Sequence, residues 1–509
     1  MPLLSRAQRR FLYLTALVNG AAIMIVEILG AKMLAPYLGT SHFVWTAQIG
    51  MAMVSLAAGY YLGGRLSDAA AGLNRLYAAM LAAAAYLALT VIGVRPVAEK
   101  CLDLPLPVGS LLASMFLFFV PLSLLAMTAP FLVRFLTHQL QQVGGAVGRL
   151  TSLSTVGSLL GTALIGYLLI PLMPNSLTMA LTAALVAVVA VAHFVVWGRR
   201  AGAATAAAAA VALLATLGVR RDLRLEYSHV KQLHRGNSNF GQLQVMETSS
   251  GSRRFYVNDY LIQNTYIPQT RQSASVFTYA LHGLARMHVE PLRSVLCIGL
   301  GIGIVPAQLA REGVQVDVVE INPAVVPVAE QFFDLDPSVM NLTIGDGRQF
   351  LNRCTNRYDA ILLDAFLGDS SPAHLMTREA FETMREVLLP GGVLVINCFG
   401  ETRQGKDFFL ASLMKTLRAV FPHVALHAAE GGNAFFAAST SPLQVHQRVD
   451  PRTVHPVVRE EVVRVLSRTQ ETDPGHGRIL TDDFNPVEFH DAANRERLRR
   501  NLARGMQEL

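Results

Sequence analysis

Seven long apolar runs between Phe11 and Val219 constrain the fold of this 509-residue chain more than any other feature. Charged residues are few there and gather mainly in the short breaks between the runs, and each run is long enough to cross a lipid bilayer. The expected spans are residues 11–35, 43–63, 74–94, 108–133, 149–171, 176–197 and 202–219. The last run is rich in alanine and is the weakest candidate. Residues 1–219 are therefore predicted to form a helical, multi-span transmembrane domain.

The overall composition agrees with a membrane protein and argues against an ordinary soluble enzyme. Hydrophobic residues make up 52% of the chain and charged residues 16%, with a mean hydropathy of +0.37. The pI near 9.3 invites a nucleic-acid partner, but the basic residues lie mainly at the ends of the apolar runs, without an aromatic-interleaved basic patch. The four cysteines have no CxxC spacing, so neither a disulfide framework nor a zinc site is supported. We therefore expect a lipid bilayer, and not nucleic acid, as a partner.

Basic residues in alternate breaks set the expected orientation. They precede the first span and follow the second, fourth and sixth spans: Arg6, Arg9, Arg10, Arg65, Arg75, Arg134, Arg149, Arg199 and Arg200. The positive-inside rule then places the N-terminus in the cytoplasm. Seven spans would put the rest of the chain outside, whereas Arg220, Arg221 and Arg224 directly after the last run favour the inside. We expect a multi-pass cell (inner) membrane protein with a cytoplasmic C-terminal half, in which either the Ala-rich run does not fully span or one break is misassigned.

Two small-residue patterns lie inside the expected spans. They are Gly59-x-x-x-Gly63 in the second span and Gly157-x-x-x-Gly161 in the fifth. Small residues four apart let two helix backbones approach closely. These patterns predict tight helix packing within the membrane domain.

From about residue 221 the hydropathy pattern changes to that of a folded α/β region. Residues 242–247 and 253–257 alternate like strands of a small antiparallel sheet, and residues 272–287 are predicted to be helical. Five apolar runs then alternate with helical stretches: residues 295–299, 316–320, 341–345, 358–364 and 392–399. Apolar strands separated by helices are typical of a parallel sheet covered on both faces, which predicts a doubly wound, Rossmann-like α/β fold.

We divide the second half, residues 220–509, into three parts. A small β subdomain is expected at 220–268, the Rossmann-like core at 269–445 and a helical tail at 446–509.

The turn after the first core strand is rich in glycine. Residues 294–303 read SVLCIGLGIG, with glycines at Gly299, Gly301 and Gly303, and a second strand ends in Glu320. Glycine lets the backbone approach a ligand and adopt the positive φ angles of a tight turn. An acidic residue at the tip of the second strand is placed to accept both hydroxyls of a ribose. The pattern predicts a nucleoside-binding βαβ unit.

Acidic residues end three successive strands of the predicted sheet. Glu320 ends the second strand, Asp346 follows the third within Gly345-Asp346-Gly347, and Asp364 ends the fourth. Ligands of such folds lie outside the carboxyl ends of the strands. Carboxylates suit a cationic adenosyl sulfonium and would repel a pyrophosphate, although each could instead cap the helix that follows. The pattern favours an adenosyl sulfonium ligand.

Residues 256–390 resemble the spermidine synthases, the polyamine aminopropyltransferases, and most closely their membrane-fused bacterial type. Glu320 matches the ribose-binding Glu of that family, and the pair Asp346-Gly347 matches the DG that holds the adenine side. The resemblance implies a fold like that of class I S-adenosylmethionine methyltransferases, preceded by a small antiparallel sheet. It also implies decarboxylated S-adenosylmethionine as co-substrate, without a metal, and a homodimer or higher homo-oligomer.

The catalytic residues follow from the same resemblance. Asp364 matches the first Asp of the family's D-[ST]-[ST]-D-P loop, the proton acceptor for the attacking amine. The loop reads DAFLGDSSP here, which leaves Asp369 as the replacement for the second Asp. Tyr279, in SVFTYALHGL, matches a Tyr beside the substrate.

Three positions depart from the family pattern. Ile302 stands where an Asp normally meets the amine of the donor, Ala280 replaces the polar residue after the Tyr, and Gly241 stands where a Gln normally contacts the nucleoside. These changes weaken recognition of an aminopropyl group and a diamine, whereas the nucleoside contacts are kept.

The resemblance implies transfer of an aminopropyl group to a diamine such as putrescine, giving spermidine and methylthioadenosine. Two alternatives remain open. One is an S-adenosylmethionine-dependent methyltransferase acting on a membrane-associated acceptor, which would explain the changes at Ile302 and Ala280. The other is a transporter or sensor that binds a nucleoside or polyamine without turnover.

Two further features concern the histidines and the C-terminal tail. Five histidines lack metal-ligand spacing and are expected to be surface or packing residues: His282, His288, His374, His423 and His427. Residues 480–488, LTDDFNPVE, are dense in turn formers and carboxylates. This segment either folds back over the site or forms a capped tail loop.

Overall fold

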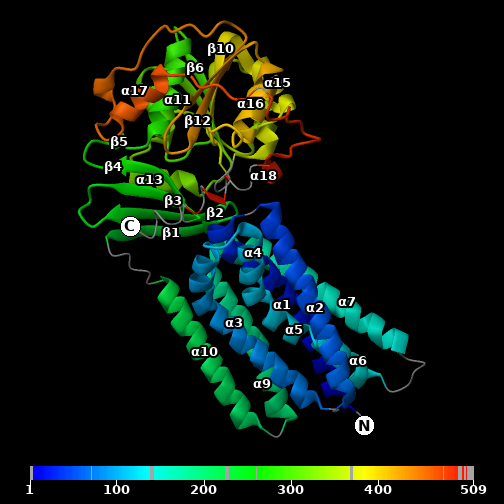
Figure 1. Ribbon diagram of the computed structural model, residues 1–509. Helices are drawn as coiled ribbons and strands as arrows, with labels where there is room; N and C mark the ends of the chain where they lie inside the picture. The colour runs from blue at the N-terminus through cyan, green and yellow to red at the C-terminus, as the bar shows by residue number, and fades with distance from the viewer. Residues whose placement is uncertain are drawn as a thin grey trace. The chain divides into compact units, whose positions relative to one another are not determined.

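The structure is a computed structural model with two compact units, Met1–Leu225 and Glu226–Leu509, whose elements are labelled in Figure 1. It describes residues 4–39, 41–69, 72–137, 143–198, 200–223, 229–259, 261–366, 371–473 and 475–490, together with residues 494, 496, 497 and 500. The two units are described separately below.

In the described part of the N-terminal unit, seven helical segments are long and apolar enough to cross a membrane. Helices α1 to α3 are Arg6–Leu38, His42–Ala69 and Leu73–Cys101. The fourth span joins α4 (Leu106–Ser114), the π-helical η1 (Met115–Phe119), α5 (Val120–Ala126) and α6 (Thr128–Leu136). The fifth joins α7 (Val143–Leu164), the π-helical η3 (Ile165–Leu169) and α8 (Ile170–Leu172), and the last two are α9 (Asn175–Val196) and α10 (Ala201–Leu223).

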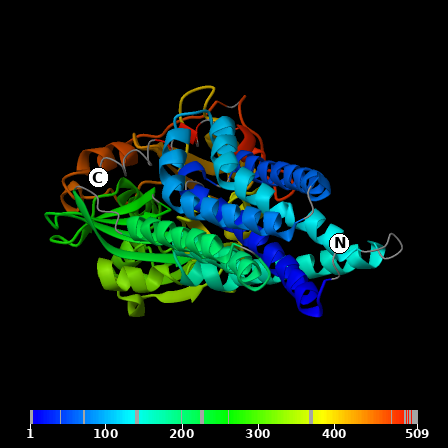
Figure 2. The same cartoon turned by 90° about the horizontal axis from the view of Figure 1, so that it is seen from below.

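The Ala-rich run forms a helix as long as its neighbours. Residues Ala201–Asp222 of α10 meet the length and composition of a membrane span, and α10 packs beside α3 and α9 (Figures 1 and 2). Arg220 and Arg221 lie in its last turn. Seven spans would put the C-terminal half outside the cell, whereas the basic residues at the end of α10 favour the cytoplasm. Because α10 is long enough to span the membrane, an incomplete last span does not explain this conflict.

Both small-residue patterns lie at close helix contacts, as predicted. A Cβ on Gly59 or Gly63 of α2 would collide with Ser123 or Met127, and a Cβ on Gly157 of α7 would collide with the carbonyl oxygen of Leu17 in α1. Gly161 meets α1 in the same way, one turn further along. Glycine is required there because the two backbones touch.

The C-terminal unit begins with a five-stranded antiparallel sheet in the order β1-β2-β3-β4-β5. Its strands are β1 (Val230–Ser238), β2 (Gly241–Thr248), β3 (Arg254–Asn258), β4 (Leu261–Ile267) and β5 (Gln272–Ser273). The sequence predicted β2 and β3. The expected helix at 272–287 begins later, as α11 (Val276–His288), because Gln272 and Ser273 pair with β4.

A seven-stranded mixed sheet follows, in the order β11-β12-β10-β9-β6-β7-β8. The five predicted strands are confirmed as β6 (Ser294–Ile298), β7 (Gln315–Glu320), β8 (Asn341–Ile344), β9 (Tyr358–Leu363) and β10 (Leu388–Phe399). These five strands are parallel to one another, as predicted, whereas β12 (Asn433–Ser439), which the sequence did not predict, is antiparallel to β10 and to β11 (His423–Ala428). The four-residue connection between β11 and β12 is too short for a crossover and closes a hairpin instead.

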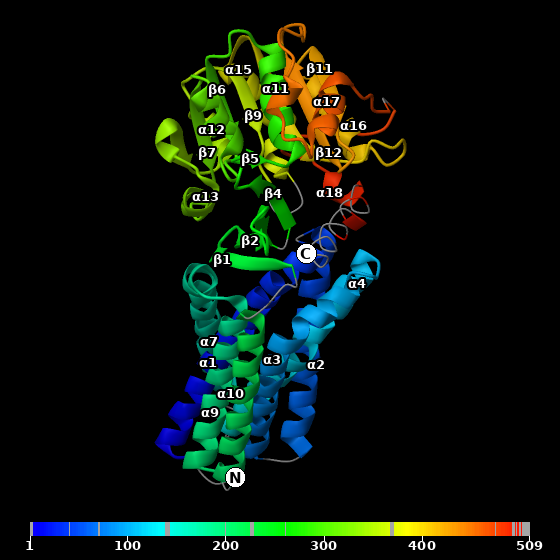
Figure 3. The same cartoon turned by 90° about the vertical axis from the view of Figure 1, so that its left-hand side faces the viewer.

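Helices cover both faces of this sheet, as the Rossmann-like prediction requires. One face packs against α11, α12 (Ile304–Arg311), α13 (Val325–Phe333) and α17 (Arg459–Ser467), and Figure 3 shows α11 and α17 side by side. The other packs against α14 (Gly347–Leu351), α15 (Arg378–Val387) and α16 (Phe408–Arg418). Along β6, Val295 and Cys297 enter the first core and Leu296 and Ile298 the second, because strand side chains alternate.

The tail continues beyond the sheet with little regular structure. Outside η6 (Pro451–Thr453), α17 and α18 (Val487–His490), most of the described residues from 446 to 490 are neither helix nor strand.

Candidate active site

A cavity of about 420 Å³ lies at the carboxyl ends of the core strands. Six of the nine predicted site residues line it: Gly299, Gly301, Glu320, Asp346, Gly347 and Asp364. These residues follow four different strands, and the parallel order of β6, β7, β8 and β9 brings the strand ends to one edge. The sheet topology therefore assembles most of the predicted site.

The glycine turn serves two different purposes. Gly299, Gly301 and Gly303 have φ angles of +102°, +54° and +78°. A Cβ on Gly299 would collide with the carbonyl oxygen of Asp364, so glycine is needed where the ends of β6 and β9 meet. Gly303 does not line the cavity but packs under Leu335. Glycine is needed there because of the positive φ and the close contact with Leu335.

Glu320 is held rigidly at the end of β7. Its Oε2 accepts from the backbone N–H of Leu300 at 2.9 Å, and its Oε1 accepts from that of Asn322 at 2.8 Å. Burial raises the pKa of Glu320, and the backbone hydrogen bonds partly oppose the rise. The carboxylate thus has a fixed position in the cavity wall, with acceptor capacity left for a ligand.

Asp346 both caps a helix and lines the cavity. Its Oδ1 accepts from the backbone N–H of Gln349 at 2.9 Å, and its Oδ2 lies 3.0 Å from Nε2 of His374. Partial burial acts to raise the pKa of Asp346, but these hydrogen bonds and the His374 imidazole hold it below its usual value. The capping role and the site role therefore coexist in this residue.

His374 is exposed, as expected of a surface residue, but its place in the site was not predicted. It lines the cavity and contacts Asp346. Metal-ligand spacing could not have revealed it because its partner is a carboxylate on another element. The available signal was its position shortly after the loop that follows Asp364.

Asp364 is a carboxyl group with a raised pKa. Desolvation raises the pKa of Asp364 to about 6; a hydrogen bond from Asn397 Nδ2 at 2.8 Å opposes this rise, and the nearby charge of Glu320 adds to it. Asn397 in turn accepts from Asn433 Nδ2 at 3.0 Å, and both asparagines line the cavity. Sequence reasoning missed this pair, although Asn397 is the one amide in the apolar run of β10.

One predicted catalytic residue, Tyr279, does not line this cavity. The hydroxyl of Tyr279 donates to the carbonyl of Ser273 at 2.8 Å and accepts from the N–H of His455 at 3.3 Å. Tyr279 lines only a second cavity of about 750 Å³, whereas the preceding residue, Thr278, lines both cavities; successive helix side chains point about 100° apart. Asp369 lies outside the described residues.

Of the three departures from the family pattern, Ile302 alone lies in the described wall of the cavity. Ile302 is 1% exposed and lines the cavity. Ala280 is fully buried and does not line it. The remaining lining includes aromatic side chains, among them Phe240, Phe277, Phe366 and Phe399. Phe366 and Phe399 pack with ring centroids 5.1 Å apart.

Gly241 occupies a turn that has no room for a side chain. It lies at the start of β2 with a φ of +126°, and a Cβ would collide with Oδ1 of Asn258. A longer residue at this position would require a different turn.

The chain is similar to proteins of known families. The spermine/spermidine synthase domain matches residues 275–429. The polyamine aminopropyltransferase of Vibrio vulnificus is 40% identical over 224 residues, covering 42% of this chain and 74% of the relative. The N-terminal histidine N-methyltransferase of Emericella nidulans is 34% identical over 146 residues, covering 28% of this chain and 25% of that protein.

Among solved structures, a probable spermidine synthase from Corynebacterium glutamicum aligns with a TM-score of 0.40 and 16% identity, over 51% of this chain and 98% of its own. The family follows from three findings: the identity to the Vibrio relative, the share of that relative that is covered, and the domain match. The chain belongs to the spermidine synthase family of polyamine aminopropyltransferases.

Proposed function

We propose that the C-terminal unit transfers an aminopropyl group from decarboxylated S-adenosylmethionine to a primary amine such as putrescine, forming spermidine and methylthioadenosine. The observation that carries the proposal is Asp364, which lines the cavity with a pKa raised to about 6, beside Glu320. A base with that pKa is deprotonated at neutral pH and still basic enough to accept a proton in the transition state.

The adenosine part of the donor would occupy the strand ends. Glu320 would accept the ribose hydroxyls, and Asp346 with Gly347 would contact the adenine side. A Cβ on Gly347 would lie 2.5 Å from Cγ2 of Ile298, so glycine keeps this wall close to β6. The carboxylates around the cavity favour the positive sulfonium.

The reaction would be a direct displacement. An aliphatic amine has a pKa near that of Lys, about 10.4, so it must lose a proton before it attacks. Asp364 would accept that proton while the amine nitrogen forms a bond to the aminopropyl carbon and the carbon–sulfur bond breaks. Methylthioadenosine leaves with the electron pair of that bond. Most of the acceleration would come from holding the two reactants in line.

The acceptor, the assembly and the cellular side are parts of the same proposal. By the family resemblance, Asp369 would hold the distal ammonium of a diamine, and the enzyme would be a homodimer or higher homo-oligomer. Arg220 and Arg221 in the last turn of α10 support a cytoplasmic catalytic unit. The seven apolar helices support a multi-pass protein in contact with lipid.

A second candidate is methyl transfer from S-adenosylmethionine to a membrane-associated acceptor. It is favoured by Ile302, an apolar residue in the cavity wall where the family has an Asp for the donor's amine. The similarity to a protein named as an N-terminal histidine N-methyltransferase also supports it. In this case Asp364 would accept a proton from a different nucleophile.

The test is to incubate the purified full-length chain with each donor and a panel of amines and to identify products by mass spectrometry. Methylthioadenosine with an aminopropylated amine is the expected result. S-adenosylhomocysteine with a methylated product would establish the second candidate instead. The Asp364→Asn protein is the matched control for background. If the parent forms neither product above that background, both candidate functions are overturned.

A further inference from the structure

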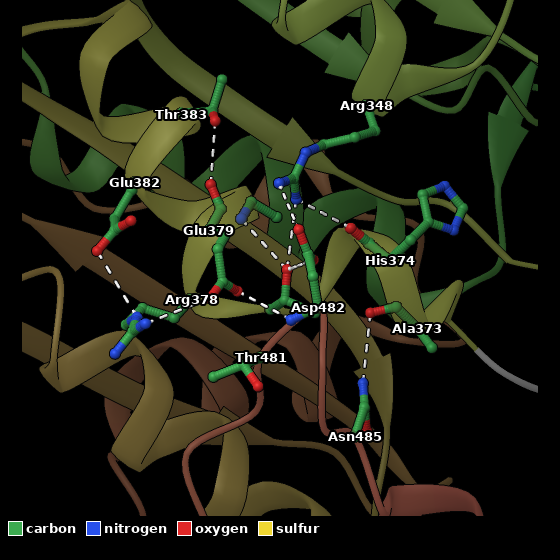
Figure 4. A network of polar contacts seen from close by, with 12 residues as sticks. Arg348, Ala373, His374, Arg378, Glu379, Glu382, Thr383, Thr481, Asp482 and Asn485 are labelled. Carbon is green, nitrogen blue, oxygen red and sulfur yellow. Dashed lines mark hydrogen bonds and ion pairs between the residues drawn. The ribbon is translucent and has the colours of Figure 1, made fainter.

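A short part of the C-terminal tail, residues Leu480–Asn485, packs onto residues 372–377 (Figure 4). Leu480 is fully buried, its N–H donates to Oγ1 of Thr416 at 2.9 Å, and its carbonyl accepts from the N–H of Arg378 at 2.8 Å. The side chain of Asn485 donates to the carbonyl of Ala373 at 3.4 Å. The segment is therefore fixed to α15 and α16 and also reaches residues 372–377.

Asp482 is the centre of this contact. Its Oδ1 accepts from the hydroxyl of Thr377 at 2.6 Å, and its Oδ2 accepts from Nη2 of Arg348 at 3.1 Å. Its own N–H donates to Oε2 of Glu379 at 3.0 Å. Asp482 thus joins the start of α15 to the side chain of Arg348 in α14.

Arg348 links the Asp346-Gly347 side of the adenosine site to residues 374–377. It directly follows Asp346-Gly347 along the chain, and its Nη1 donates to the carbonyl of His374 at 3.1 Å and to the hydroxyl of Thr377 at 3.3 Å. The side chain of the same His374 contacts Asp346 at 3.0 Å. Arg348 and Asp346 therefore hold the backbone and the side chain of His374 from two neighbouring positions.

The energetic weight of Asp482 comes from its partners, because the Asp482 side chain is itself 51% exposed. The Arg348 side chain is 17% exposed and Thr377 is 2% exposed, so both depend on protein partners. Removing Asp482 leaves the more buried guanidinium without its carboxylate and the Thr377 hydroxyl without its acceptor, which costs more than loss of a fully exposed pair. Without Asp482, the guanidinium would have to seek water or another acceptor, and its bond to the carbonyl of His374 would be disturbed.

We propose that Asp482 is a positioning residue for the adenosine site: through Arg348 and Thr377 it fixes residues 372–377 so that His374 stays on Asp346. Asp482 does not line the cavity, so it acts through this segment and not on the ligand. The proposal rests on the proposed function only in taking an adenosyl compound as the ligand.

A first test does not need any ligand. Hydrogen–deuterium exchange of the full-length protein is compared for the parent, Asp482→Ala and Asp483→Ala. Asp483 is a matched control because it is adjacent and exposed, and no hydrogen bond or ion pair joins it to the described residues. Asp482→Ala should speed exchange of amides in residues 372–377 by about tenfold, and Asp483→Ala should not. Equal exchange in all three proteins would overturn the proposal.

A second test measures the affinity of methylthioadenosine and of S-adenosylhomocysteine by calorimetry. Asp482→Ala should weaken the better-bound nucleoside by about tenfold, with Asp482→Asn in between, because the amide keeps an acceptor for Thr377 but loses the charge facing Arg348.

The decisive comparison is made in a His374→Ala background. If Asp482 acts through His374, removing it there should have little further effect on affinity. A full tenfold loss in that background would show a general loss of stability and would overturn the positioning role. If the parent protein bound neither nucleoside, the proposed function would fail, whereas the exchange measurement would still decide whether Asp482 fixes residues 372–377.

Discussion

The side-chain amide of Asn397 donates to Oδ1 of Asp364 over 2.8 Å, while its carbonyl oxygen accepts from Asn433 over 3.0 Å. The second bond fixes which end of the Asn397 amide faces the carboxylate. A donated hydrogen bond stabilises the charged form of a carboxylate. Asn397 therefore limits how far burial can raise the pKa of Asp364.

Replacing Asn397 by Ala should make the reaction more sensitive to acid. Asp364 must be deprotonated to accept a proton, so the parent rate should fall as pH drops through about 6. Without the donated bond the pKa of Asp364 should rise by about one unit, moving this fall to higher pH. The pH dependence of kcat/KM measures the shift, and an unchanged profile would show that Asn397 does not tune the base. Asn433→Ala should give a smaller shift in the same direction.

Replacing Asp364 by Asn should reduce turnover by about 10²–10⁴. The amide keeps the shape of the side chain but cannot accept a proton at neutral pH. Affinity for methylthioadenosine should change by less than about tenfold, because the adenosine contacts come from other strands. Raising the pH should partly restore turnover, since more of the acceptor amine is already neutral. Near-parental turnover at pH 7 would place the base elsewhere, with Asp369 as the next candidate.

Replacing Glu320 by Gln should weaken methylthioadenosine binding by at least about tenfold, the effect of losing a charge-assisted hydrogen bond. Gln can still accept one of the backbone hydrogen bonds from Leu300 and Asn322, so the turn should survive better than in Glu320→Ala. Calorimetry gives the affinity, and circular dichroism verifies the fold. Unchanged affinity in a folded Glu320→Gln protein would contradict the ribose assignment.

The two cavity glycines should differ in their tolerance of alanine. Gly299→Ala forces a Cβ against the carbonyl of Asp364 at a φ of +102°, so the ends of β6 and β9 must separate. A Cβ added at Gly301 would meet no other atom within 4 Å, and at its φ of +54° alanine costs only about 1–2 kcal/mol. Thermal unfolding should therefore show a clearly larger loss of stability for Gly299→Ala. Equal losses would mean that the close approach of the two strands is not rigid.

The catalytic unit should be inaccessible from outside the cell. The native thiols are removed by substitution of Cys101, Cys297, Cys354 and Cys398, and a single cysteine is introduced at the exposed Ser250. A membrane-impermeant thiol reagent should label it only after lysis. Labelling in intact cells would place this unit outside and favour an orientation with seven full spans.

The sequence predicted the features that local patterns determine. Apolar runs and their spacing gave the seven helices and the five core strands, and the residues at the strand ends gave Glu320, Asp346 and Asp364. Residues brought together only by tertiary folding were not predicted. His374 and Asn397 reach the site from a loop and a distant strand, and no spacing along the chain links them to their partners.

The sequence also did not predict which side chains of α11 face the cavity or the direction of β12. The resemblance selected Tyr279, but α11 presents Thr278 to the cavity, and the direction of β12 depends on a four-residue hairpin rather than on its hydropathy.

The contact of Gly157 and Gly161 with α1 also bears on how the membrane unit is made. These glycines lie in the fifth span, more than a hundred residues after the first, so α1 enters the bilayer long before its close neighbour has been synthesised. Insertion of a span depends on its own hydrophobicity, whereas docking depends on the small residues at the contact. A bulky apolar substitution at Gly157 should therefore leave all the spans threaded through the membrane. The biogenesis defect should instead be an undocked first helix, open to degradation by membrane quality control.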